Sequence, residues 1–91
     1  MAVIDAVAKE FNMKPKELLK ESLKTYLEKR LSKVEADIFL LAKKYGVKDV
    51  FDLDSKVKEG IVSEKEAYDD YFVLDNLEAE RKKIKGFLEK L

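Results

Sequence analysis

The sequence contains no cysteine, histidine or tryptophan, only one proline and only three glycines. Without cysteine it can form no disulfide and no thiolate metal site. Without histidine or cysteine, its serines and its single threonine lack the usual base that activates a nucleophile. The glycines are too far apart to form a phosphate-binding loop. These absences argue against an enzyme, so we expect no catalytic residue, no cofactor and no bound metal.

Long apolar runs are also missing. No stretch approaches the ~20 apolar residues that cross a bilayer. Residues 1–11 carry Asp5, Lys9 and Glu10 where a signal peptide would have its apolar core. The sequence therefore predicts a cytoplasmic protein without a membrane partner.

Neither sign of charge is in excess, because 19 basic side chains balance 19 acidic ones. This balance does not favour nucleic acid as a partner. The charged fraction is 42%, against roughly 25% in typical domains. Abundant Lys and Glu without glutamine are typical of a thermophile. The charge is unevenly placed, with +4 in residues 1–48, −8 in residues 49–80 and +4 in residues 81–91. An antiparallel fold or a contact between chains would bring the opposite charges together.

The stretch 15–45 predicts one long helix. It contains no glycine and no internal proline, and its apolar residues recur at helical spacing. Pro15 suits a first helical turn, and Gly46 after Lys43 and Lys44 is a typical stop signal. A helix this long cannot bury its own apolar stripe. It must lie against a second helix, another chain, or both.

Three further segments complete an expected all-α fold. Residues 2–11 predict a short helix, and residues 64–90 predict a second long helix that begins with a capping box from Ser63 to Glu66. Residues 48–59 predict a short helix or turns. Their apolar side chains would cover the open end of a hairpin: Val50, Phe51, Leu53 and Val57. We predict a single domain, 1–91, in which the short N-terminal helix accompanies an antiparallel hairpin of two long helices.

Such a hairpin is a layer with two faces, and the short helix can cover only part of one. From Leu27 onward the apolar steps alternate between four and three residues, the spacing of a coiled coil. We therefore expect a homo-oligomer, a dimer or higher, that forms a helical bundle. The predicted oligomer interface consists of Leu27, Leu31, Val34, Ile38, Leu41, Leu77, Ile84 and Leu88.

Aromatic side chains gather among acids near the start of the second long helix. Aromatic residues are typical of the centres of protein interfaces. The predicted partner-binding residues, for a second protein, are Tyr68, Asp69, Tyr71 and Phe72.

Two alternative functions use other residues. Glu66, Asp69 and Asp70 could hold Mg²⁺ in a helical nucleotide hydrolase. Glu66 and Asp69 match one half of the paired carboxylate motif of such enzymes, but the E-x-x-E half is missing. A ridge of Lys16, Lys20 and Lys24 could contact phosphates in a DNA-associating regulator, although glutamates alternate with these lysines.

Residues 7–31, with the run LLKESLKTYLEKRL, resemble the two-helix part of ribbon-helix-helix antitoxins. In that family the helices form the dimer, and a preceding β-ribbon contacts DNA. Here only Met1 and Ala2 stand before Val3, the first residue on the apolar face of the expected helix, so we expect no ribbon and carry over no DNA-reading residue. The part from Lys44 onward is similar to small uncharacterised archaeal proteins suspected to be antitoxin-type partners. The expected function is a non-catalytic, self-associating interaction module, with an antitoxin-type role as its specific form.

Overall fold

The computed structural model describes residues 2–91, which form four α-helices and no strand. The helices are α1 (Ala2–Glu10), α2 (Pro15–Tyr45), α3 (Val50–Lys58) and α4 (Glu64–Lys90). The predicted all-α class is confirmed. The helix bounds differ from the predicted ones by no more than two residues, and the uncertain segment 48–59 contains a regular helix.

The ends of α2 form as the sequence indicates. Lys14 is extended, and Pro15 occupies the first turn. At the other end Gly46 adopts the left-handed conformation, with φ of +64°, and its N–H bonds back to the carbonyls of Ala42 and Lys43. Glycine is the residue that takes this conformation without a steric penalty. The capping box predicted at the start of α4 does not form. Ser63 does precede the helix, but its side chain makes no capping hydrogen bond.

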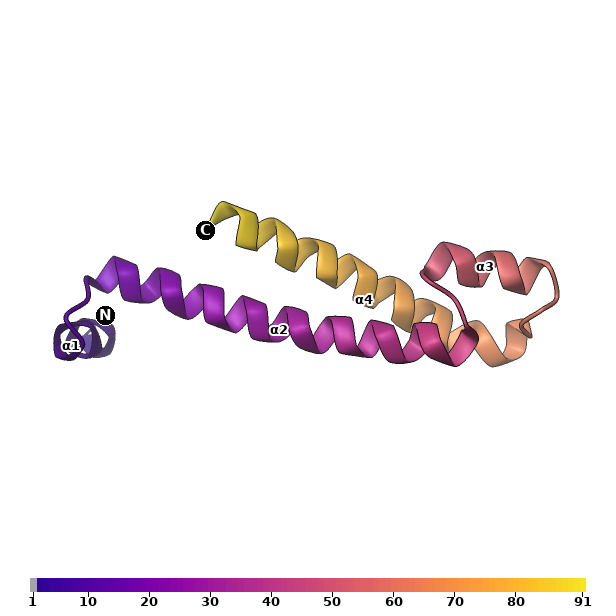
Figure 1. Ribbon diagram of the computed structural model, residues 1–91, viewed down its shortest axis with the longest axis horizontal. Helices are drawn as coiled ribbons and strands as arrows, with labels where there is room; N and C mark the ends of the chain where they lie inside the picture. Colours follow the sequence, from indigo (N-terminus) through magenta and orange to yellow (C-terminus); the bar gives the residue numbers. More distant parts are fainter. Residues whose placement is uncertain (1) are drawn as a thin grey trace.

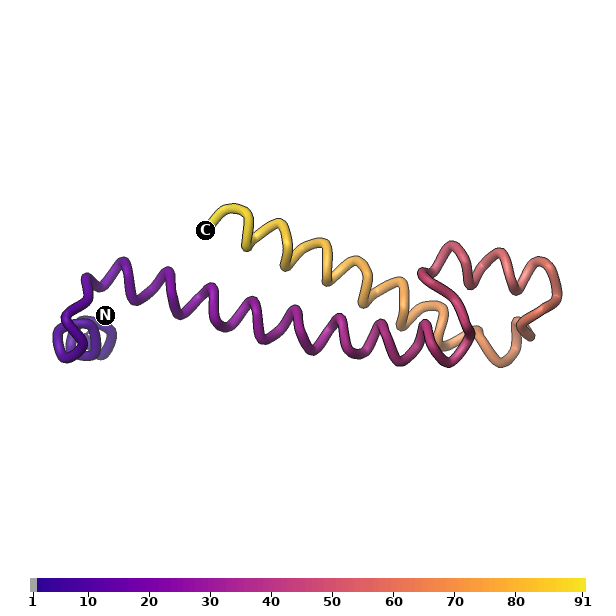
Figure 2. The backbone as a smooth tube through the Cα atoms, viewed as in Figure 1, coloured from indigo at the N-terminus to yellow at the C-terminus, as the bar shows by residue number. Residues whose placement is uncertain are grey.

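Helices α2 and α4 run antiparallel and form the hairpin that was predicted (Figure 1). Two contacts set their register: Tyr45 of α2 meets Asp70 of α4, and Arg30 meets Glu80. Helix α3 packs on the first part of α4, and α1 is seen end-on where it crosses the start of α2 (Figure 1). Because α4 begins beyond the end of α2, its C-terminus lies well short of the start of α2 (Figure 2).

The core is a seam between α2 and α4 that continues beneath α3. Leu53, Leu74 and Val34 are the largest side chains that are fully buried. Val50 and Leu53 of α3 join this core, as predicted for residues that cover the hairpin's end. Phe51 does not, because it is 80% exposed. It follows the buried Val50 and precedes the buried Leu53, so the helical turn directs it outward.

The molecule is a rod rather than a globule. Its extents are 60 × 19 × 18 Å, and its radius of gyration is 19.1 Å. A compact chain of this length would have a radius of gyration of about 12 Å. The rod exposes 7225 Å², whereas a compact monomer of the same mass exposes about 5,400 Å². The difference is surface that the chain cannot cover by itself.

Candidate functional site

The residues predicted to form the oligomer interface lie together in the seam within one chain. Val34, Ile38 and Ile84 are buried there. The other five residues pack against this core and stay partly exposed. They are Leu27, Leu31, Leu41, Leu77 and Leu88. The heptad-like spacing is therefore used by the chain's own second helix, and a contact of the five partly exposed residues with a second chain stays a prediction.

A further apolar surface begins where the seam ends. No residue of α2 before Leu27 belongs to the core cluster. We call residues 15–26 the free segment of α2; at 1.5 Å per residue they extend for about 18 Å. Leu19, Leu23 and Tyr26 follow one another at helical spacing along it, and all three are exposed. A large apolar stripe that stays exposed is typical of an interaction surface.

Helix α1 packs on α2 and exposes apolar side chains of its own at the same end of the rod. Ala8 is its single buried residue. Val3, Val7 and Phe11 recur every four residues and are exposed, Phe11 just after the helix ends. The turn between α1 and α2 is tight, with Asn12 in a positive-φ conformation and the Met13 N–H bonded to the Ala8 carbonyl. One end of the rod therefore presents apolar side chains from both helices.

The opposite end carries a hollow between α3 and α4, which we call the aromatic pocket. Its volume is about 260 Å³. Tyr68 and Phe72 lie edge to face with ring centroids 5.2 Å apart, and Tyr71 and Phe72 lie edge to face at 5.5 Å. The pocket is lined by Asp54, Val57, Glu64, Ala67, Tyr68, Tyr71 and Phe72. Three of the four predicted partner-binding residues thus come together, while Asp69 is exposed and does not line the pocket.

The contribution of α3 to this pocket was missed from the sequence. Asp54 and Val57 are three residues apart and belong to the face of α3 that meets α4. Their spacing was visible, but nothing in the sequence says which neighbour a nine-residue helix packs against. The Lys58 ammonium lies 2.9 Å from the Asp54 carboxylate. This contact raises the pKa of Lys58, with a smaller contribution from Tyr71.

A polar cluster of Lys44, Tyr45 and Asp70 joins α4 to the end of α2 beside the pocket. One oxygen of Asp70 accepts hydrogen bonds from the Tyr45 hydroxyl at 2.5 Å and from the Lys44 ammonium at 2.7 Å. The hydrogen bond from Lys44 lowers the pKa of Asp70 most, and the one from Tyr45 lowers it further. Burial raises the pKa of Tyr45 most, and its hydrogen bond to Asp70 raises it further. The Tyr45 hydroxyl also lies 3.3 Å from the Glu66 carbonyl. The cluster therefore joins α4 to the end of α2 through groups that are already paired with one another.

This cluster makes the stability of the fold depend on pH. A folded-state pKa below the ordinary value means that ionised Asp70 stabilises the fold above about pH 4 and that this contribution is lost as the pH falls through the lowered pKa. We expect Asp70→Asn to lower the melting midpoint at neutral pH and to behave like the unmodified protein in strong acid. Thermal unfolding followed by circular dichroism across this range measures it. Asp69→Asn, at an exposed neighbour without these donors, should change little; a deficit for Asp70→Asn that persists in acid would contradict the assignment.

The residues of the two alternative functions have the following positions. No group of three or more metal-ligating side chains occurs in residues 2–91. Asp70, one of the three carboxylates considered for Mg²⁺, is the acceptor of the cluster just described. Lys16, Lys20 and Lys24 are exposed on the free segment.

None of the four helices is both long and apolar enough to cross a membrane.

Comparison with known proteins identifies a family over the full length. No curated protein and no solved structure matches the chain significantly. The family model described as the uncharacterized protein MJ0235 family matches residues 1–91. The rod with an apolar end, an aromatic pocket and a hairpin seam is therefore a structure for that family, and the chain belongs to the MJ0235 family.

Proposed function

We propose that the protein is a non-catalytic helical module that self-associates and binds another protein chain. The uncovered surface carries this proposal. The rod exposes 7225 Å², about 1,800 Å² more than a compact monomer of its mass. A standard protein interface removes about 800 Å² from each partner. The excess is large enough to supply such an interface.

The apolar end of the rod is the surface that supports self-association most directly. Leu19, Leu23 and Tyr26 expose their side chains on the free segment, and α1 adds further apolar residues beside them. Burying apolar surface contributes roughly 25 cal/mol for each Å². The seam, by contrast, is already occupied within the chain. The dimer we propose therefore forms around the free segment, with the predicted seam residues inside each subunit.

An antitoxin-type role is the specific form of this proposal. The segment that resembles the two helices of ribbon-helix-helix antitoxins, residues 7–31, spans the end of α1, the turn and all of the free segment. In that family these helices make the dimer. The resemblance and the exposed stripe thus favour the same surface for self-association.

Replacing Leu19 by glutamate tests the proposal. Leu19 is exposed, so Leu19→Glu should leave the fold intact while placing a charge in the proposed contact. We expect the dissociation constant of the dimer to rise at least about tenfold. Sedimentation equilibrium over the micromolar range measures this constant, and circular dichroism checks the fold.

Phe39→Glu is the matched control. Phe39 is exposed on the same helix, and at 100° per residue it lies about half a turn away from the stripe. It should leave the dimer unchanged. An unmodified protein that remains monomeric throughout this range, or a dimer that Leu19→Glu and Phe39→Glu weaken equally, would contradict the proposal.

Magnesium provides a further test against the hydrolase alternative. Because Lys44 and Tyr45 already bind the Asp70 carboxylate, we expect millimolar Mg²⁺ to leave the melting midpoint within the error of measurement. Differential scanning calorimetry with and without the ion measures this. A rise in the midpoint that is lost in Asp70→Asn would favour the hydrolase instead.

A further inference from the structure

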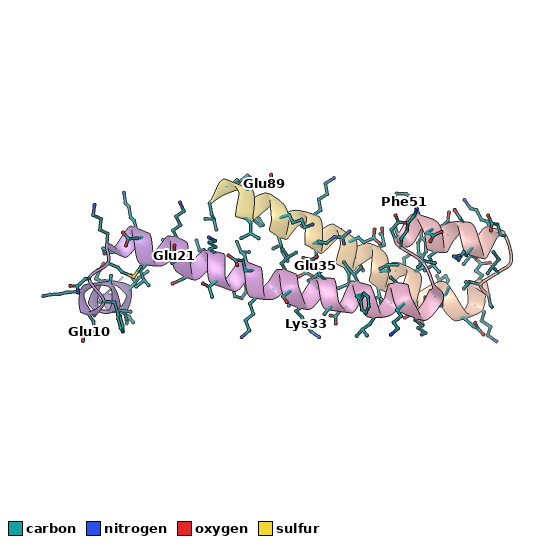
Figure 3. All side chains as sticks on the ribbon, viewed as in Figure 1. Glu10, Glu21, Lys33, Glu35, Phe51 and Glu89 are labelled. Atoms are coloured by element: carbon teal, nitrogen blue, oxygen red, sulfur yellow. The ribbon has the colours of Figure 1, made fainter. Side chains whose placement is uncertain are left out.

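The two surfaces that the chain leaves uncovered lie at opposite ends of the rod. The free segment and α1 form one end, and the aromatic pocket between α3 and α4 lies at the other (Figure 1). Figure 3 shows Glu10 of α1 and Phe51 of α3 at these two ends. The rod between them is 60 Å long. A single chain therefore cannot bring its own two surfaces together.

The two ends also differ in charge. Residues 1–26, which comprise α1, the turn and the free segment, carry a net charge of +1, and residues 49–72, which include α3 and the start of α4, carry −5. At 100° per residue, Lys16 and Lys20 lie on the side of α2 next to the exposed stripe, whereas Glu17 and Glu21 lie on the opposite side. Ammonium groups thus border the stripe on one side, and on the other side Tyr26 lines a hollow that also includes Glu17 and Glu21. The aromatic pocket is bordered by carboxylates, those of Asp54 and Glu64.

We infer that two copies of this chain associate antiparallel, so that the aromatic pocket of each copy packs on the free segment of the other. This inference rests on the proposed self-association and adds its geometry. Each contact joins an apolar stripe to exposed rings and basic side chains to acidic ones. Opposed charges of this kind steer the encounter of two chains and fix their register.

Symmetry favours the same arrangement. In an antiparallel pair of equal rods each end meets the opposite end of its partner, so both contacts form at once around a two-fold axis. The same contact made between parallel, displaced rods would leave one free end on each side and would continue into an open chain. A pair joined through two free segments would bring Lys16 and Lys20 of both copies together, and like charges in a contact are unfavourable.

One carboxylate of the aromatic pocket already binds a lysine of its own helix. The Lys58 ammonium is 2.9 Å from the Asp54 carboxylate, one turn away on α3. Glu64, on the α4 side of the pocket, makes no hydrogen bond or ion pair to another part of residues 2–91. Rings beside a carboxylate attract cations both through the ring face and through the charge. A lysine bordering the stripe of the second copy matches this unpaired carboxylate.

Spin labels on single cysteines test the orientation, since the chain has no cysteine of its own. Lys14→Cys places a nitroxide just before the free segment, and Lys65→Cys places one beside Tyr68; both positions are exposed. In a mixture of the two labelled proteins we expect a short distance between unlike labels by pulsed electron resonance. In each protein alone we expect like labels to be separated by nearly the 60 Å length of the rod.

The outcomes separate this inference from the function on which it rests. Sedimentation equilibrium of the unlabelled protein first establishes whether a dimer exists. If it does and two labels at position 14 are close together, the antiparallel arrangement is wrong while self-association stands. If no dimer exists, both fail.

A substitution in the pocket gives an independent readout. Tyr68 is 59% exposed and outside the core, so Tyr68→Glu should fold normally. We expect it to raise the dissociation constant of the dimer at least about tenfold, as Leu19→Glu does, while Phe39→Glu leaves it unchanged. Dimerisation that is insensitive to Tyr68→Glu would exclude the pocket from the contact and overturn the inference.

Discussion

Replacing Leu74 by alanine is expected to destabilise the whole rod by about 2–5 kcal/mol. Leu74 is fully buried in the seam, where α4 packs on α2. Truncating it removes apolar contacts and leaves a cavity, and both effects lower the free energy of unfolding. A domain of this length has a total stability of about 5–14 kcal/mol. Because so few large side chains are fully buried here, the loss is a substantial share of that total.

Urea denaturation followed by circular dichroism measures the loss as a shift of the transition midpoint. Val73→Ala is the matched control, since Val73 is the preceding residue on the same helix and is exposed. It should change the free energy of unfolding by no more than about 0.5 kcal/mol. Equal effects of the two substitutions would show that the seam is not the core of the protein.

The helices could be predicted closely because their signals are local. Pro15 and Gly46 mark the ends of α2 through their backbone preferences alone, and the structure places the helix between them. The start of α4 was also predicted, although for a partly wrong reason. Ser63 stands at the expected position without making the expected bond. A helix that packs over its full length can begin at the right residue without that cap.

The partner of the seam could not be predicted from spacing. An apolar stripe at helical period has to be buried, but the period is the same whether the covering helix belongs to the same chain or to another. Leu31, Val34 and Ile38 were predicted to lie against a second helix, another chain, or both; the structure packs them in the core with α4 of their own chain, and their role between chains stays a prediction. Which part of α2 stays free follows from the length and offset of α4, which become visible only in three dimensions.

The aromatic pocket was predicted in part for a related reason. Tyr68 and Phe72 are one turn apart on α4, so their proximity follows from helix geometry. The other wall comes from α3, which reaches α4 only through the fold of the connection between Gly46 and Ser63. Long-range packing of this kind has no local signal in the sequence.

Replacing Leu53 by alanine is expected to loosen α3 more than the rest of the molecule. Leu53 is fully buried and is the largest apolar anchor of this nine-residue helix. An isolated helix of this length is not stable in water. The smaller Val50 and Val57 also pack on the core. Two hydrogen bonds add to them: the Asp49 carboxylate accepts the Asp52 N–H, and the Glu78 carboxylate accepts the Val50 N–H, both at 2.8 Å. None of these contacts replaces the large apolar contact that Leu53 makes.

Hydrogen exchange separates this local effect from global unfolding. In Leu53→Ala we expect the amides of α3 to exchange at least about a hundredfold faster, which corresponds to about 2.7 kcal/mol, the lower part of the range for such a truncation. Amides in the middle of α2 should lose less protection. Phe51→Ala, at an exposed neighbour on α3, should leave the exchange of α3 almost unchanged. Equal losses in α2 and α3 would mean that the rod unfolds as one unit.

If α3 alone is released, the aromatic pocket loses one of its walls. Dimerisation through the pocket should then weaken at a temperature where the hairpin of α2 and α4 is still folded.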